Sequence, residues 1–135
     1  MKPTLLLLSR LPDSFIIRLR EHFDCHFYLL LDDKRLMELA PTVRGIVATA
    51  ESSVPGVLIA RLPALEIISV LGVGYDGIDL EAARAHNICV THTPEVATED
   101  IADFAIALLL CTARQMLTAD RFVRRGEWTA GRHPM

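Results

Sequence analysis

Short apolar runs with strand character alternate with amphipathic, helix-like runs along residues 4–93 of this sequence. The alternation favours a parallel sheet, because a chain can enter the next parallel strand only after crossing back over one face of the sheet. The expected strands are residues 4–9, 25–30, 45–49, 65–71 and 88–93. The expected helices are residues 12–23, 34–40, 55–62 and 80–85. The sequence therefore predicts a small doubly wound α/β domain.

Local signals define several of these elements. Asp13 or Ser14 can accept a hydrogen bond from the first turn of the first helix, and Asp79 can do the same for the helix that begins at residue 80. Residues 65–71 are apolar almost throughout, which is typical of a central parallel strand that is buried on both faces.

The last part of the chain has a different pattern. Thr98 is a candidate N-cap, and residues 101–117 are apolar on almost every face. Such a helix must be buried on more than one side. We expect one long helix over residues 98–125 that ends near Gly126. The basic side chains near its end suit a helix C-terminus better than a phosphate site; they are Arg121, Arg124 and Arg125.

Composition bounds the class of protein. The chain has 135 residues, of which 51% are hydrophobic and 23% charged, and this suffices for one core. A net charge of -3 gives no general attraction to nucleic acid or to acidic membranes. Neither residues 5–8 nor residues 101–113 are long enough for a membrane span. We therefore expect no nucleic-acid partner and no membrane partner.

The cysteines are Cys25, Cys89 and Cys111, an odd number in separate apolar or strand-like contexts. This usage indicates reduced thiols and a cytoplasmic chain. We expect each of them to be a buried small apolar side chain rather than a nucleophile. No pattern of residues indicates a metal site.

Residues 72–77 spell GxGxxG directly after a predicted strand. A dinucleotide site would need a helix that opens at these glycines, whereas the best helix cap, Asp79, follows the last of them. The carboxylate of Asp76 also falls inside the loop and would repel a pyrophosphate. The glycines instead allow backbone amides to converge on a smaller anion such as a carboxylate. A tight turn that binds no ligand is the alternative.

Three blocks in order carry a family resemblance: IISVLGVGYDGID at residues 67–79, ARAHNICVTHTP at 83–94 and TEDIADFAIALLL at 98–110. Together they resemble the D-isomer-specific 2-hydroxyacid dehydrogenases, especially the glyoxylate and hydroxypyruvate reductase branch. The segment ADRFVRRGEW at residues 119–128 is similar to the same family. Residues 1–44 carry little motif.

The resemblance implies a flavodoxin-like substrate-binding domain over residues 1–97. Residues 98–135 would form an interdomain and dimerisation helix and the start of a Rossmann domain that binds NAD or NADP. The resemblance further implies that backbone amides in the loop Leu71, Gly72, Val73 and Gly74 hold the carboxylate of a small 2-oxo or 2-hydroxy acid. Thr98 and Ile101 match positions near the cofactor. A homodimer formed through residues 98–125 is expected.

Three other residues follow the third predicted strand and would face the same cleft: Ala50, Glu51 and Ser52. The resemblance implies that the pyrophosphate glycines lie just beyond the position that matches Trp128, and that the catalytic arginine, glutamate and histidine lie further along; none of them has a counterpart in this sequence. We therefore expect an N-terminal part of an NAD(P)-dependent oxidoreductase that reduces 2-oxo acids such as glyoxylate or hydroxypyruvate, inactive alone and without tight cofactor binding.

The histidines should not fill the place of the missing acid, because no carboxylate stands at a spacing that indicates a catalytic pair. We expect surface or packing roles for all of them: His22, His26, His86, His92 and His133. The alternative function is a stand-alone flavodoxin-like module that binds a small anion or regulates another protein. Which 2-oxo acid is used, and whether NAD or NADP is preferred, stays open.

Overall fold

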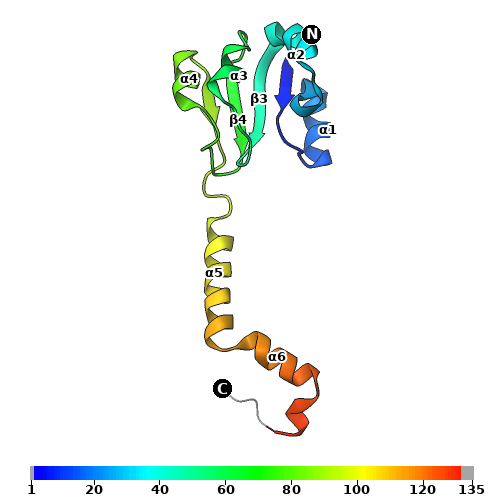
Figure 1. Cartoon of the computed structure of the whole chain (residues 1–135), viewed down its shortest axis with the longest axis vertical. Helices are drawn as coiled ribbons and strands as arrows, with labels where there is room; N and C mark the ends of the chain where they lie inside the picture. Colours follow the sequence, from blue (N-terminus) through cyan, green and yellow to red (C-terminus); the bar gives the residue numbers. More distant parts are fainter. Residues whose placement is uncertain (1, 132–135) are drawn as a thin grey trace. The chain divides into compact units, whose positions relative to one another are not determined.

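The computed structural model describes residues 2–131. The chain divides into two compact units, residues 1–94 and 95–135, and each is described by itself. The first unit carries the sheet and four α-helices, and the second is helical (Figure 1).

The sheet of the first unit has five parallel strands in the order β2-β1-β3-β4-β5. The strands are β1 (Thr4–Leu7), β2 (Asp24–Phe27), β3 (Val43–Thr49), β4 (Ile67–Leu71) and β5 (Cys89–Thr91). The parallel register places Leu6 beside Ile46, Ile46 beside Ile68, and Ile68 beside Val90. This order is the flavodoxin-like one, so the predicted fold class is confirmed.

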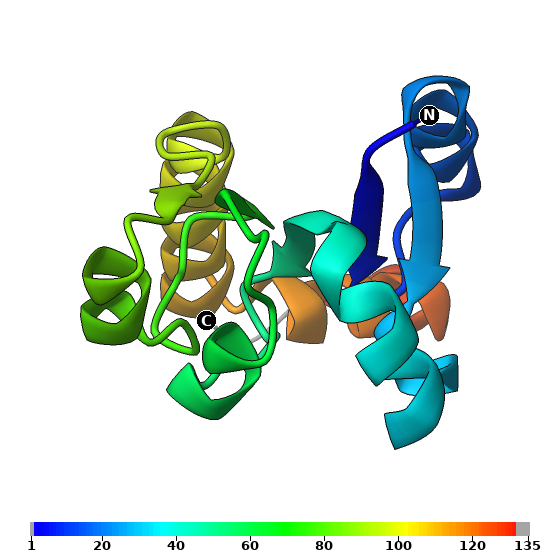
Figure 2. The ribbon, with the colours of Figure 1, turned by 90° about the horizontal axis from the view of Figure 1, so that it is seen from above.

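Helices cover both faces of the sheet, as Figure 2 shows for α1 on one side and α2, α3 and α4 on the other. The helices are α1 (Asp13–His22), α2 (Asp33–Leu39), α3 (Gly56–Ala60) and α4 (Leu80–Ala85). Ile16 of α1 packs with Leu7 and Val47, whereas the other three helices bury a larger cluster around Ile46 and Ile68. The chain thus buries apolar side chains on two sides of one sheet.

Two predictions about the strands of the first unit are wrong. Residues 28–30, expected to continue the second strand, form the 3₁₀ helix η1 (Tyr28–Leu30), because the pairing of β1 with β2 ends at Leu7 and Phe27. Strand β4 is not buried on both faces: Ile67 and Leu71 are 38% and 42% exposed. The helix on that face, α1, packs over β1 and β3, so it leaves this part of β4 bare within the unit.

Helix caps follow the prediction in part. Asp79 caps α4, with its side-chain Oδ1 accepting a hydrogen bond from the amide of Ala82 at 2.9 Å. Asp32, which was not predicted, caps α2 in the same way. Helix α1 has Pro12 at its N-cap, so Asp13 and Ser14 lie inside the first turn and neither caps the helix. A second 3₁₀ turn, η2 (Ala40–Thr42), leads from α2 into β3.

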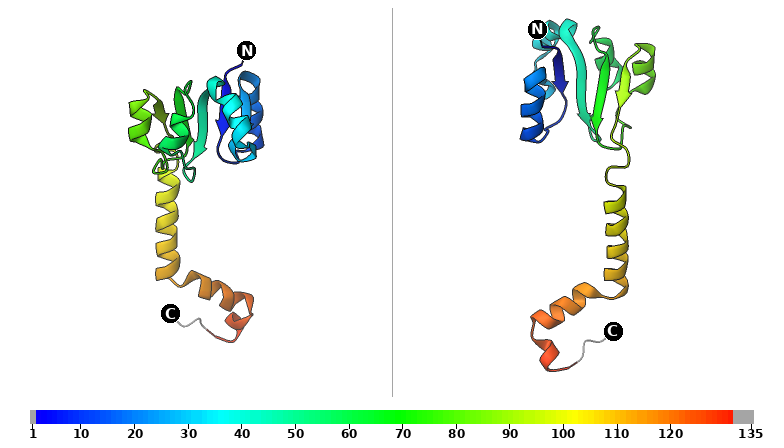
Figure 3. Two further views of the ribbon diagram at one scale, coloured as in Figure 1. Left: turned by 45° about the horizontal axis from the view of Figure 1, so that its top comes forward. Right: turned by 180° about the vertical axis from the view of Figure 1, so that it is seen from behind.

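The second unit contains α5 (Thr98–Ala113), α6 (Met116–Arg124) and the 3₁₀ helix η3 (Glu127–Thr129). The single helix predicted over residues 98–125 is wrong, because Gln115 adopts a left-handed backbone with φ of 50° and separates α5 from α6 (Figure 3). Ala97 rather than Thr98 occupies the N-cap of α5. Gly126, with φ of 75°, follows the end of α6, close to the predicted end.

Helix α5 is apolar but does not bury any of its own side chains in this unit. Among the described residues, no single helix has both the length and the apolar character needed to cross a membrane; α5 and α6 meet that test only as a pair bent by 62°.

Gly77 stands where a side chain has no room. A Cβ at this position would lie 2.1 Å from the carbonyl oxygen of Ser52. We expect Gly77→Ala to lower the free energy of unfolding by about 3 kcal/mol, because two backbones must move apart. Urea unfolding followed by circular dichroism measures this.

Gly131→Ala is the matched control, since nothing lies within 4 Å of the Cβ it would add. Equal stability of the two variants would contradict the close packing of the loops around Ser52 and Gly77.

Candidate functional site

Two loops meet at the carboxyl edge of the sheet, the edge at which open α/β sheets bind ligands. One follows β3 and the other follows β4. The amide of Val54 donates to the carbonyl of Gly77 at 2.8 Å, and the amide of Asp79 donates to the carbonyl of Val54 at 3.1 Å. These hydrogen bonds join residues 50–54 to residues 72–79.

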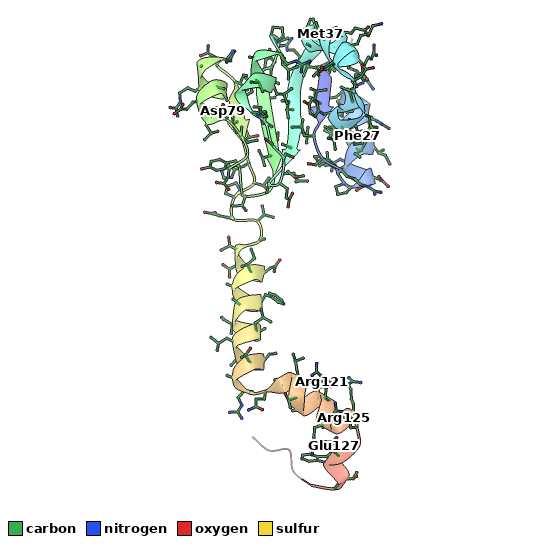
Figure 4. All side chains as sticks on the ribbon, in the orientation of Figure 1. Phe27, Met37, Asp79, Arg121, Arg125 and Glu127 are labelled. Atoms are coloured by element: carbon green, nitrogen blue, oxygen red, sulfur yellow. The ribbon has the colours of Figure 1, made fainter. Side chains whose placement is uncertain are left out.

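The loop after β4 does not open a helix at its glycines. Gly72 has φ of 142°, a backbone conformation that favours glycine. A Cβ on Gly72 would also lie 3.3 Å from the Cβ of Ala50. Helix α4 begins only at Leu80, after its cap Asp79 (Figure 4). The bare amides of a helix N-terminus therefore do not lie at the glycines, so these residues do not fit a dinucleotide pyrophosphate.

The segment that follows β5 holds this loop. The amide of Thr93 donates to the carbonyl of Gly72 at 2.9 Å, and the amide of Gly72 donates to Oγ1 of Thr93 at 3.0 Å. His92 Nδ1 lies 2.9 Å from the carbonyl oxygen of Val73. The ring of His92 also meets the ring of Tyr75 edge to face, with centroids 5.0 Å apart. The Gly72 amide is thus already occupied.

Two backbone amides of the segment Leu71 to Gly74 remain unpaired. Within residues 2–131, no hydrogen bond engages the backbone N–H of Val73 or of Gly74. Val73 is 54% exposed, so the turn faces solvent. A carboxylate can accept hydrogen bonds from two such donors, and the charge on the acceptor strengthens them. Of the loop Leu71 to Gly74, Val73 and Gly74 are therefore the candidate donors.

A cluster of hydroxyl groups shapes the neighbouring loop. Ser52 is 8% exposed, and its Oγ lies 2.7 Å from Oγ of Ser9 and accepts from the amide of Thr49 at 2.8 Å. Oγ of Ser9 also lies 3.0 Å from Oγ1 of Thr49. These hydroxyls satisfy one another, so they act as structure rather than as nucleophiles. They hold the turn from which Ala50 and Glu51 project.

Both loops carry an exposed carboxylate, Glu51 in one and Asp76 in the other. Asp76 Oδ2 lies 3.7 Å from the place that a Cβ of Gly74 would take. Its negative charge opposes a bound anion in proportion to that anion's charge, so a pyrophosphate is disfavoured more than a single carboxylate.

Thr98 and Ile101, predicted to lie near a cofactor, stand in the first turn of α5 in the second unit. Both are exposed. The basic residues at the end of α6 are partly neutralised within that unit: Arg124 Nε donates to Asp120 Oδ1 at 2.9 Å, and Arg125 lies 3.8 Å from Glu127 (Figure 4). They fit the predicted complement to a helix end.

Two histidines lie near a carboxylate that the sequence did not indicate as a partner. His26 Nε2 lies 3.1 Å from Asp24 Oδ2, although the geometry does not make a hydrogen bond, and the exposed His22 Nε2 lies 4.0 Å from Glu21 Oε2. His26 and Asp24 belong to β2, which β1 and β3 separate from β4, so their pair is remote from the glycine loop. His133 lies outside the described residues.

The cysteines are free, as expected, but their predicted burial is wrong. Cys89 is exposed, and Cys25 and Cys111 are only partly buried. Partial burial is the main reason why the pKa of the Cys25 thiol is raised, which makes it a poorer nucleophile. Among the described residues, no group of three or more His, Cys, Asp or Glu side chains could hold a metal ion.

Sequence reasoning missed His92 and Thr93 as parts of the site. A usable signal was present: both residues directly follow β5, which is parallel to β4, so their backbone reaches the same edge as the glycine loop. The Thr93 hydroxyl is then within hydrogen-bond distance of the Gly72 amide, and the His92 ring is within hydrogen-bond distance of the Val73 carbonyl.

Comparison with known proteins gives a consistent family. The family described as D-isomer specific 2-hydroxyacid dehydrogenase, catalytic domain, matches residues 5–130. A curated relative named 2-ketogluconate reductase, from Gluconobacter oxydans, is 40% identical over 99% of this chain and 43% of its own length. Glyoxylate/hydroxypyruvate reductase B of Escherichia coli is 37% identical over 99% of this chain and 42% of its own length.

Solved structures agree with these relatives. A 2-hydroxyacid dehydrogenase from Ketogulonicigenium vulgare superposes with a TM-score of 0.94 at 37% identity, over all of this chain and 43% of that one. An NADPH-dependent glyoxylate/hydroxypyruvate reductase from Sinorhizobium meliloti, in complex with NADP and malonate, superposes with a TM-score of 0.77 at 34% identity. It is matched over all of this chain and 42% of its own length. The chain thus spans less than half the length of these relatives.

Proposed function

Because the chain belongs to the D-isomer-specific 2-hydroxyacid dehydrogenase family, we propose that it forms the substrate-binding part of an NAD(P)-dependent oxidoreductase that reduces a small 2-oxo acid to a D-2-hydroxy acid. The names of its relatives support glyoxylate, hydroxypyruvate or 2-ketogluconate as the substrate class. The NADP in the Sinorhizobium meliloti structure supports a nicotinamide cofactor.

The observation that carries this proposal is the pair of unpaired amides at Val73 and Gly74, at the carboxyl edge of the sheet. A 2-oxo acid has one carboxylate, which matches two donors and one nearby negative charge better than a polyphosphate does. In the proposed complex the loop Leu71 to Gly74 holds the carboxylate and so orients the carbonyl carbon. One relative was solved in complex with malonate, a dicarboxylate, which agrees with a site for carboxylates.

The nicotinamide cofactor would supply the hydride when bound. Thr98 and Ile101 are the residues that we assign to its neighbourhood. The loop of residues 72–77 does not fit its pyrophosphate, as its helix starts too late and Asp76 lies inside it. We therefore assign nucleotide binding, and the acid that protonates the substrate oxygen, to polypeptide outside residues 1–135. Three free cysteines support a cytoplasmic location.

A small-anion-binding module remains the second candidate. It is favoured by the fact that the glycine loop and all its hydrogen-bonding partners lie within residues 1–94, in one compact unit. Coding DNA downstream of residue 135 discriminates between the two: a continuing reading frame with a second GxGxxG supports the enzyme.

Oxamate, a 2-oxo acid analogue that is not reduced, tests the carboxylate site. In residues 1–135 we expect it to shift the ¹⁵N–¹H signals of Val73 and Gly74, with a dissociation constant on the order of 1–10 mM. The Gly72 signal should move less, because Thr93 already binds that amide. Acetamide, which is uncharged, is the control. Unmoved Val73 and Gly74 signals would refute the site.

Residues 1–135 alone should not turn substrate over, because the loop of residues 72–77 does not fit a dinucleotide and, among the described residues, no histidine beside that loop is paired with a carboxylate. The measurement is absorbance at 340 nm with glyoxylate and NADPH or NADH. Oxidation of either coenzyme above the rate without protein would overturn this assignment.

We also propose that the chain forms a homodimer through α5 and α6. Large apolar side chains along α5 are at least half exposed; they are Ile101, Phe104, Ile106, Leu108, Leu109 and Leu110. An apolar surface of this extent is typical of a protein interface. The proposed interface therefore comprises two helices instead of one, and α5 within it remains apolar.

Sedimentation velocity at micromolar concentration tests the dimer. We expect dimers of the wild-type chain, and about ten-fold weaker association for Leu109→Lys, because a charge would be buried in the interface. Val57→Lys is the control, as Val57 is 74% exposed on α3 in the first unit and should leave association unchanged. A wild-type monomer would contradict the proposal.

A further inference from the structure

We propose that His92 and Thr93 are positioning residues that hold the amides of Val73 and Gly74 in the direction from which they bind the substrate carboxylate. The inference rests on the proposed function of the loop and adds to it the two side chains that determine its geometry. It gives a role to His92, a residue for which the sequence indicated only a surface or packing role.

The hydrogen bond between His92 and Val73 fixes a whole peptide group. The carbonyl of Val73 and the N–H of Gly74 belong to the same planar trans peptide, so they point in opposite directions. A ring nitrogen 2.9 Å from the Val73 oxygen therefore also determines where the Gly74 N–H points. Because a carbonyl oxygen only accepts, His92 must carry its proton on Nδ1, which sets the ring tautomer.

Thr93 fixes the residue before this peptide. Gly72 accepts from the Thr93 amide at 2.9 Å and donates to the Thr93 hydroxyl at 3.0 Å. The regular pairing of β4 with β5 ends at Ser69 and Thr91, so these contacts extend the connection beyond the ladder. Glycine would otherwise leave the turn with many backbone conformations, and this freedom would weaken ligand binding. The turn is therefore held on both sides of Val73.

Tyr75 supports the orientation of the imidazole. Its ring lies 5.0 Å from that of His92 at an interplanar angle of 76°, an edge-to-face contact. Tyr75 belongs to the same loop as Val73, so the imidazole contacts the turn through both a hydrogen bond and a ring contact. No salt bridge to His92 occurs among residues 2–131, so its described contacts are with this loop.

Replacing His92 by an amide side chain distinguishes the roles of the two ring nitrogens. His92→Asn places an N–H donor near the position of Nδ1, whereas His92→Gln places one near Nε2, and His92→Leu has none. We expect His92→Asn to bind oxamate within about two-fold of the wild type. His92→Gln and His92→Leu should bind about five-fold more weakly, as expected for the loss of one orienting hydrogen bond.

His86→Leu is the matched control. Like His92, His86 is exposed, and its Nδ1 lies 2.9 Å from a backbone carbonyl, that of Ala82 in α4. The control should not change oxamate affinity. Thr93→Val, which leaves the Gly72 amide unpaired, should weaken oxamate about five-fold, and Thr93→Ser should restore it.

A measurement without ligand tests the positioning role of His92 separately. Long-range ¹H–¹⁵N spectra of the neutral imidazole should show His92 protonated on Nδ1, and His92→Leu should move the Gly74 amide signal, unlike His86→Leu. Equal oxamate affinity in the wild type, His92→Leu and Thr93→Val would overturn the inference while leaving the proposed function intact. An Nε2–H tautomer at His92 would also overturn it. Absence of oxamate binding in the wild type would instead refute the proposed function, on which the positioning role of His92 and Thr93 rests.

Discussion

Parallel pairing of β3, β4 and β5 is the constraint on which the candidate site depends. Because neighbouring strands run in the same direction, their carboxyl ends reach one edge, and the three segments that follow them meet there. Residues 50–54, 72–79 and 92–93 are distant in sequence yet hydrogen-bond to one another. An antiparallel pairing of any of these strands would send one segment to the opposite edge.

In the proposed site, backbone amides bind the ligand and side chains hold the loops in place. Hydroxyl groups from Ser9, Thr49 and Ser52 satisfy one another under the first loop, and Thr93 and His92 hold the second. The amides of Val73 and Gly74 then remain available to a ligand. Such an arrangement tolerates many side chains around the turn, because the donors themselves are peptide groups present in every residue except proline.

Much of the fold could be predicted from the sequence, and the predictions that were wrong have identifiable physical causes. Apolar runs indicated all five strands, and Asp79 was identified as a cap because a carboxylate beside free amides is a local interaction. Residues 28–30 left the sheet because their neighbour, β1, ends at Leu7, and no local pattern reports the length of a partner strand. The left-handed backbone of Gln115, which separates α5 from α6, could not be predicted from the sequence either, since glutamine normally favours a helix.

The sequence by itself determined the class of fold, the family, and the loop of residues 71–74 as the candidate carboxylate-binding segment. It could do so because apolar periodicity and turn glycines act over a few residues. Tertiary structure decided which amides of that loop are free. The Gly72 amide is engaged by Thr93 and those of Val73 and Gly74 are not, and this difference arises from a residue that follows β5, 21 positions further along the chain. Hydrogen bonding between distant segments depends on three-dimensional register, and register follows from packing of the whole sheet.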